Sequence, residues 1–153
     1  MTPQYIKIDS NGNKFYYKDK EMTSYHREDG PAFEGADGYK VWYLNGQPHR
    51  EDGPAIDHGD GTKNWYKHGK RHREDGPAYE GADGTKAWII NGLYHREDGP
   101  AIEWMNGSKE WILNGERLTE QEFLKRTAKE TILSMDEIAA KFGIEVSKLK
   151  IQK

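Results

Sequence analysis

The sequence predicts a mainly β fold, an elongated single antiparallel sheet of about five hairpins that ends in a small C-terminal α-helical cap. The heptapeptide His-Arg-Glu-Asp-Gly-Pro-Ala occurs four times without substitution, always 23 residues apart. Identical copies at one period indicate one small unit that is built repeatedly. The composition agrees with a thin, turn-rich β structure, because only 34% of residues are apolar, 32% are charged and 17 are glycine.

Each repeat unit is predicted to contain two strands and two turns. The copies of the heptapeptide begin at His26, His49, His72 and His95. In the third unit, Ala78–Glu80 and Thr85–Ile90 are apolar enough for strands, and Gly81–Gly84 separates them. The pair Asn91-Gly92 then predicts a tight hairpin turn, since both residues tolerate positive φ. No segment of helical length intervenes, so the strands should pair antiparallel in sequential order.

Residues 1–25 form a degenerate first unit, and residues 26–117 contain the regular repeats. The expected strands of the first unit are Tyr5–Ile8 and Lys14–Lys18, with Tyr16 at the position that tryptophan holds in later units. Ten residues separate Tyr16 from His26, whereas seven separate each later tryptophan from the next unit, which indicates an insertion of three residues. Altered terminal units are expected because the ends of an array face water.

Alternation along the strands places different residues on the two faces of the sheet. Trp42 and Leu44 should share one face, where the tryptophans fill a thin core, while Tyr43 points the other way. Aromatic rings beside arginines can bind a partner, and two histidines depart from the repeat consensus. The candidate binding residues are therefore Tyr43, Tyr66, His58, His68, Arg27, Arg50, Arg73 and Arg96.

The segment Trp65-Tyr-Lys-His-Gly-Lys-Arg-His72 resembles the MORN repeat, with its aromatic residue, turn and basic pair. The 23-residue period is also similar to that of MORN units, which are β-hairpins stacked into one elongated sheet. The heptapeptide departs from the usual MORN ending and resembles repeat proteins that are abundant in tailed phages. The resemblance covers roughly residues 14–118 and implies a scaffold or binding surface.

Residues 118–153 are predicted to form the helical cap. Thr119 and Glu122 make a capping box for a helix that extends to about Lys129, and a second box predicts a helix over Met135–Phe142. The apolar spacing after Ile138 also fits a DNA-binding helix-turn-helix. The cap is favoured because the segment from Glu116 onward has eight basic and seven acidic residues, which is no phosphate-binding footprint, and because an exposed sheet edge needs a cover.

The sequence predicts no catalytic residue, no metal site and no cofactor. The chain has no cysteine, and the glycines sit at repeat turns rather than in a phosphate-binding loop. Equivalent histidines about 10 Å apart cannot share a zinc ion, whose bonds are about 2 Å long. We expect the arginine of each heptapeptide to pair with acids of successive repeats along one edge, and the histidine to bond a turn carbonyl.

The sequence predicts a non-enzymatic protein-interaction module that is encoded by a phage and acts on a host protein. A more specific form of this prediction is an inhibitor of host antiviral defence. The alternatives are sequestration of a small nucleotide or saccharide, or DNA binding by the tail. The net charge of −3 disfavours nucleic acid and anionic membranes as partners. The N-terminal residues lack a signal-peptide pattern, so a cytoplasmic location is expected.

Overall fold

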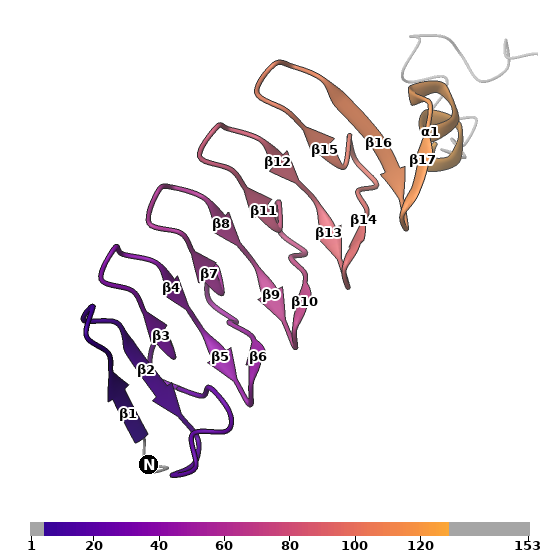
Figure 1. Ribbon diagram of the computed structural model, residues 1–153. Helices are drawn as coiled ribbons and strands as arrows, with labels where there is room; N and C mark the ends of the chain where they lie inside the picture. The colour runs from indigo at the N-terminus through magenta and orange to yellow at the C-terminus, as the bar shows by residue number, and fades with distance from the viewer. Residues whose placement is uncertain (1–4, 129–153) are drawn as a thin grey trace, which may run out of the picture.

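The computed structural model describes residues 5–128, which form an elongated array of hairpins with one helix at the C-terminal end (Figure 1). The body is an 11-stranded antiparallel sheet whose strands follow the order of the chain. The mainly β hairpin array predicted from the sequence is confirmed. The strands of this sheet are β1 (Tyr5–Ile8), β2 (Lys14–Tyr17), β3 (Phe33–Glu34), β4 (Lys40–Val41), β7 (Ile56–Asp57), β8 (Lys63–Asn64), β11 (Tyr79–Glu80), β12 (Lys86–Ala87), β15 (Ile102–Glu103), β16 (Lys109–Leu113) and β17 (Glu116–Leu118).

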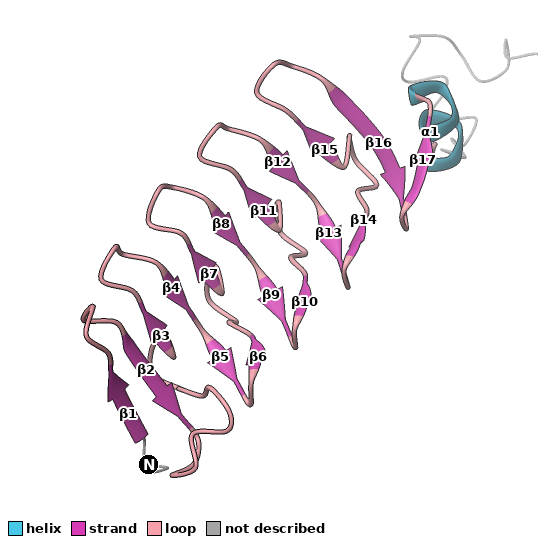
Figure 2. Ribbon diagram, viewed as in Figure 1, coloured by secondary structure: helices cyan, strands magenta, loops and turns pink. Residues whose placement is uncertain are grey.

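Three two-stranded hairpins continue from β4, β8 and β12 of the body sheet (Figure 2). In the unit that begins at His26, the chain leaves β4, passes through Trp42 and enters β5, so the short hairpin continues directly from the body sheet. The heptapeptide then returns the chain from the short hairpin to the body sheet. The short hairpins are β5 (Tyr43–Leu44) with β6 (Gln47–Pro48), β9 (Tyr66–Lys67) with β10 (Lys70–Arg71), and β13 (Ile89–Ile90) with β14 (Leu93–Tyr94).

The tight turns have the backbone conformation that the Asn-Gly pairs predict. Asn45 and Gly46 have φ values of 51° and 75°, as a type I′ turn requires. His68 takes the asparagine position with a φ of 48°, in the left-handed region that asparagine and glycine tolerate best. Its imidazole stacks on that of His49, with 4.5 Å between ring centroids.

The core is distributed along the sheet instead of filling one compact centre. The alanine that ends each heptapeptide is fully buried, and its carbonyl accepts a bond of 2.8 Å from the amide of the preceding unit's Tyr16, Trp42, Trp65 or Trp88. Ile89, Ile102 and Ile112 are buried in one apolar cluster, against which Trp65 and Trp104 pack. Every unit therefore depends on packing against its neighbours.

The C-terminal end is covered by α1 (Glu120–Thr127), which begins at the predicted capping box. The Thr119 hydroxyl accepts from the Glu122 amide at 3.2 Å, and the Glu122 carboxylate accepts from the Thr119 amide at 2.8 Å. Phe123 is buried against Trp111, with ring centroids 4.7 Å apart, and Arg126 pairs with Glu116 of β17 at 2.7 Å.

The predicted second helix, Met135–Phe142, and the helix-turn-helix alternative lie outside the described residues. Over residues 5–128, no helix has the length and apolar character that crossing a bilayer requires.

Candidate functional site

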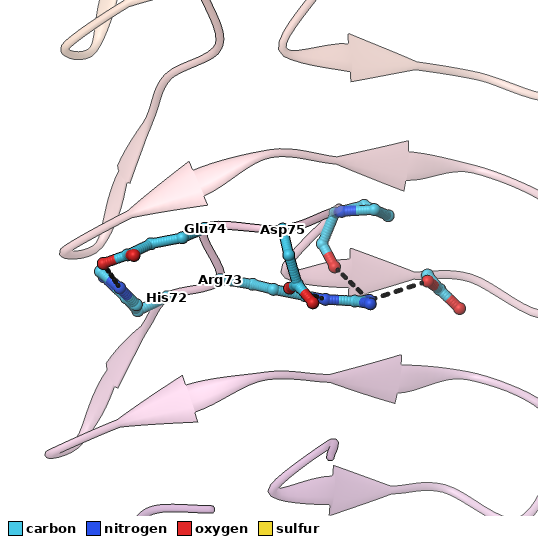
Figure 3. A network of polar contacts seen from close by, with 6 residues as sticks. His72, Arg73, Glu74 and Asp75 are labelled. Carbon is cyan, nitrogen blue, oxygen red and sulfur yellow. Dashed lines mark hydrogen bonds and ion pairs between the residues drawn. The ribbon is translucent and has the colours of Figure 1, made fainter. Parts of the chain in front are cut away.

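The arginine of each heptapeptide is the centre of a polar network within its own unit. In the third unit, the Arg73 guanidinium lies over the Trp65 ring, 4.2 Å from its centroid. Its Nε donates to Asp75 at 2.9 Å, and its Nη1 donates to the Pro77 carbonyl and to Glu80, both at 3.2 Å (Figure 3). The guanidinium is thus stacked and charge-paired at once.

The same network recurs in the other units. Arg27, Arg50 and Arg96 lie 4.1, 4.1 and 3.8 Å from the ring centroids of Tyr16, Trp42 and Trp88. Each donates to the aspartate two residues on, at 2.7 to 2.9 Å. The expectation that arginines pair with acids of successive repeats is therefore wrong: the paired acids belong to the arginine's own unit.

The second unit lacks one contact of this network. Arg27, Arg73 and Arg96 each donate to a glutamate seven residues on. The corresponding residue for Arg50 is Asp57, whose shorter side chain accepts instead from the Gly59 amide at 3.0 Å. Arg50 is thus held by fewer groups than the other three arginines.

The heptapeptide glycine leaves room for the arginine side chain, and its backbone conformation is one that other residues can adopt. None of the four has a positive φ. A Cβ built on Gly76 would lie 2.9 Å from Cζ of Arg73, and the equivalent distances in the other units are 2.8 to 3.0 Å. The guanidinium therefore occupies the space that a side chain would take at this position.

The heptapeptide histidine connects each unit to the next. Nδ1 of His72 accepts from the amide of Asn91 at 3.1 Å, and His26, His49 and His95 make the equivalent bond at 3.0 to 3.2 Å. The acceptor role of Nδ1 places the proton of the neutral ring on Nε2, which faces the glutamate two residues on. The partner is a turn amide and not the turn carbonyl that the sequence suggested.

The heptapeptide carboxylates should make the array sensitive to acid. The pKa values of Asp52, Asp75 and Asp98 are lowered, first of all because the neighbouring arginine donates a hydrogen bond to each. A carboxylate whose pKa is lower in the folded than in the unfolded state stabilises the fold at pH values above its unfolded pKa of about 4. This stabilisation is lost as the pH falls through the folded-state pKa.

We therefore expect the urea midpoint to fall between pH 5 and pH 3. The fall should be smaller in the triple variant Asp52→Asn, Asp75→Asn, Asp98→Asn, because it has already lost these carboxylates. Urea titrations at the two pH values measure the difference. An equal fall in both proteins would contradict the contribution assigned to the three aspartates.

We call the surface that carries these arginines and tryptophans the heptapeptide face. Its arginine side chains are held by contacts within the chain. The four arginine side chains are only 19 to 25% exposed. Grooves of about 620 and 530 Å³ separate successive heptapeptides. Their linings consist largely of the same repeated residues, including Arg50, Asp52, Arg73 and Asp75. This face offers nearly the same chemistry in every unit.

The opposite surface, the aromatic face, differs from unit to unit. In the N-terminal half it has a hollow of about 200 Å³. The ring centroids of Phe15 and Phe33 are 5.0 Å apart, and those of Phe15 and Tyr25 are 6.2 Å apart. Burial raises the pKa of the Tyr39 and Tyr43 hydroxyls, so these rings are partly removed from water. The lining residues are Phe15, Tyr25, Phe33, Tyr39, Val41 and Tyr43.

A second hollow of about 350 Å³ lies further along the aromatic face. Its floor contains Ala87, whose equivalents at the 23-residue period are Val41, Asn64 and Glu110. Alanine has the smallest side chain of the four, which leaves the surface hollow at this unit. The lining residues are Arg71, Tyr79, Asp83, Thr85, Ala87, Tyr94, Ile102 and Trp104.

The structure separates the residues that the sequence nominated for binding. Tyr43 lies on the aromatic face. His58 joins it there, with its ring 5.2 Å from that of Tyr39 and its Nε2 3.2 Å from the Asn64 amide nitrogen. Tyr66 is on the same face, close to Arg71, whereas His68 lies at a turn. Arg27, Arg50, Arg73 and Arg96 are on the heptapeptide face, so they do not share a site with the tyrosines.

Sequence reasoning missed several residues of the aromatic face. The signal was available, because these positions change between units that are otherwise alike: the position of Arg71 holds Pro48, Tyr94 and Arg117 elsewhere. A comparison of units position by position identifies the face that is free to vary. The missed residues are Asn64, Arg71, Tyr79, Tyr94 and Trp104.

No protein-family model matches the chain, and no curated protein sequence matches it. Within residues 5–128, no group of three or more histidine, aspartate or glutamate side chains is arranged to hold a metal ion. The fold and the two faces define an array of β-hairpins with one repeated, internally paired face and one aromatic face whose residues differ between units.

Proposed function

We propose that the chain is a non-enzymatic protein-binding scaffold whose aromatic face binds a protein partner. The observation that carries the proposal is the contrast between the two faces. The heptapeptide face repeats one set of contacts that are satisfied within the chain, whereas the aromatic face presents a different combination of rings and polar groups in each unit. Specific recognition requires such a non-repeating surface.

The residue types of the aromatic face also support a protein partner. Tyrosine and tryptophan supply a large contact area at a small cost in side-chain entropy, and they are enriched among interface hot spots together with arginine. Tyr94 is 39% exposed, and the rings around the two hollows are partly buried by their neighbours. The rings are therefore held in place before a partner arrives, which favours affinity.

The partner we propose is a host protein in the cytoplasm of an infected cell. The support is the resemblance of the repeat to proteins of tailed phages, and a small phage protein that binds without catalysis is suited to block host machinery. A component of host antiviral defence is the sharper form of this proposal.

The matched variants Tyr94→Ser and Leu93→Ser test the use of the aromatic face. Tyr94 pairs with Ile89 and Leu93 with Ile90, so these adjacent residues point to opposite faces, and both are exposed. In capture from host lysate by the tagged full chain, we expect Tyr94→Ser to recover at least tenfold less of the stoichiometric partner. Leu93→Ser should recover it as the parent chain does.

Two results would count against the proposal. One is equal recovery of the partner by both variants, and the other is the absence of any stoichiometric partner from lysates prepared under varied conditions. A thermal-shift panel of nucleotides and saccharides examines the alternative, and stabilisation by one of these compounds would favour a sequestering binder instead.

A further inference from the structure

We propose that Arg71 anchors an aspartate or glutamate side chain of the protein partner. This inference rests on the proposed function and adds the chemistry of one contact. It is based on a comparison of one pair of positions on the aromatic face, those of residues 64 and 71, with the same pair two units further along.

The later pair is an internal ion pair. Glu110 lies on β16 and Arg117 on β17, and the Arg117 guanidinium is 3.0 Å from the Glu110 carboxylate. These residues are 46 positions after Asn64 and Arg71, which is two repeat periods. The earlier unit therefore keeps the arginine but has a neutral asparagine where the carboxylate stands.

Arg71 makes no ion pair with any carboxylate of residues 5–128. Its guanidinium lies 5.9 and 5.6 Å from the ring centroids of Tyr66 and Tyr79, and its Nε is buried without a hydrogen-bond partner. Asn64 is only 2% exposed, and its Oδ1 is also without a partner. A buried donor without a partner is unfavourable, so the Arg71 guanidinium gains from an external acceptor. The Asn64 oxygen is itself an acceptor and supplies no counter-charge to Arg71.

The hollow beside Arg71 provides room for the incoming side chain. Tyr79, Tyr94 and Trp104 line it, and the small side chain of Ala87 leaves space between them. The other charged group of the hollow is Asp83, in the turn between β11 and β12, whose carboxylate accepts from the Thr85 amide and hydroxyl at 2.9 Å each. That carboxylate is held by its own turn and leaves Arg71 without an internal counter-ion.

A carboxylate is the occupant that these features favour. The planar guanidinium presents parallel donors that match the two oxygens of a carboxylate. The adjacent rings lower the local dielectric constant and strengthen the attraction. The internal pair of Glu110 and Arg117 demonstrates that this position of the arginine, on the same face, is within reach of a carboxylate.

A peptide selection tests the inference on the full chain. The probe is a display library of random linear dodecapeptides, selected against the parent protein, Arg71→Gln and the matched control Arg117→Gln. We expect acidic residues to be enriched at one peptide position by about tenfold over the input for the parent and for Arg117→Gln. The enrichment should be absent for Arg71→Gln.

The variant Asn64→Glu provides an independent measurement. It places a carboxylate where Glu110 stands in the later unit, so the new side chain should pair with Arg71 and remove the acidic enrichment in a folded protein. No acidic enrichment with the parent, or equal enrichment with Arg71→Gln, would overturn the inference. Lysate capture that is sensitive to Tyr94→Ser but indifferent to Arg71→Gln would also overturn it, while the proposed function would stand.

Discussion

Replacement of Phe123 by alanine should lower the free energy of unfolding by about 3 kcal/mol, as the loss of a buried phenylalanine side chain does elsewhere. Phe123 is 2% exposed and packs against Trp111, with the two ring planes tilted by 45°. In the earlier units an arginine covers the aromatic ring, but the corresponding position of the last unit holds Thr119. Phe123 covers the ring in its place, so its removal uncovers Trp111 and releases α1 from the sheet. Urea unfolding followed by tryptophan fluorescence measures the change.

The control for this variant is Leu124→Ala in the same helix. Leu124 is 56% exposed, so its replacement should change the free energy of unfolding by less than about 0.5 kcal/mol. Similar losses for the two variants would mean that α1 does not owe its position to the ring of Phe123.

Replacement of Arg73 by lysine should lower the free energy of unfolding by about 2 kcal/mol, because the ammonium group cannot reproduce the fork of donors or the stacked plane. The variant leaves Asp75, Glu80 and the Pro77 carbonyl with at most one shared donor group. Since the side chain is 23% exposed, solvent offsets part of the loss. The same urea titration measures it.

Arg50→Lys is the matched comparison, because Arg50 lacks the contact with a glutamate that Arg73 has. We expect its loss to be smaller than that of Arg73→Lys by about 0.5–1 kcal/mol. Unchanged stability in both variants would contradict a structural role for these arginines and would return them to the set of candidate partner contacts.

The sequence was sufficient to predict the long antiparallel sheet and the order of its strands, but not the three separate short hairpins that continue from it. The 23-residue period predicted the repeated hairpins, the Asn-Gly pairs predicted the tight turns, and the Thr119 capping box predicted the start of α1. All three predictions are confirmed. Tyr16 also takes the tryptophan position beneath Arg27, as the degenerate first unit predicted.

The side-chain contacts of the heptapeptide were not predictable in the same way. They depend on where a long arginine side chain comes to rest, and strand periodicity does not determine that. The stacking of Arg73 on Trp65 explains the glycine at position 76 and the choice of Asp75 and Glu80 as partners. The candidate site on the aromatic face was only partly predicted, since Tyr43 and Tyr66 were chosen by alternation and Arg71 was overlooked.

The hydrogen bond that each heptapeptide histidine accepts from the next turn has a consequence for how such a chain changes length. Because the bond joins only adjacent units and every donor and acceptor is equivalent, removal or duplication of one 23-residue unit rejoins the chain with the same junction. A chain that is shortened or lengthened by one unit should therefore fold by the same rules. The order of residues along the aromatic face changes in the process, while the contacts of the heptapeptide face are kept.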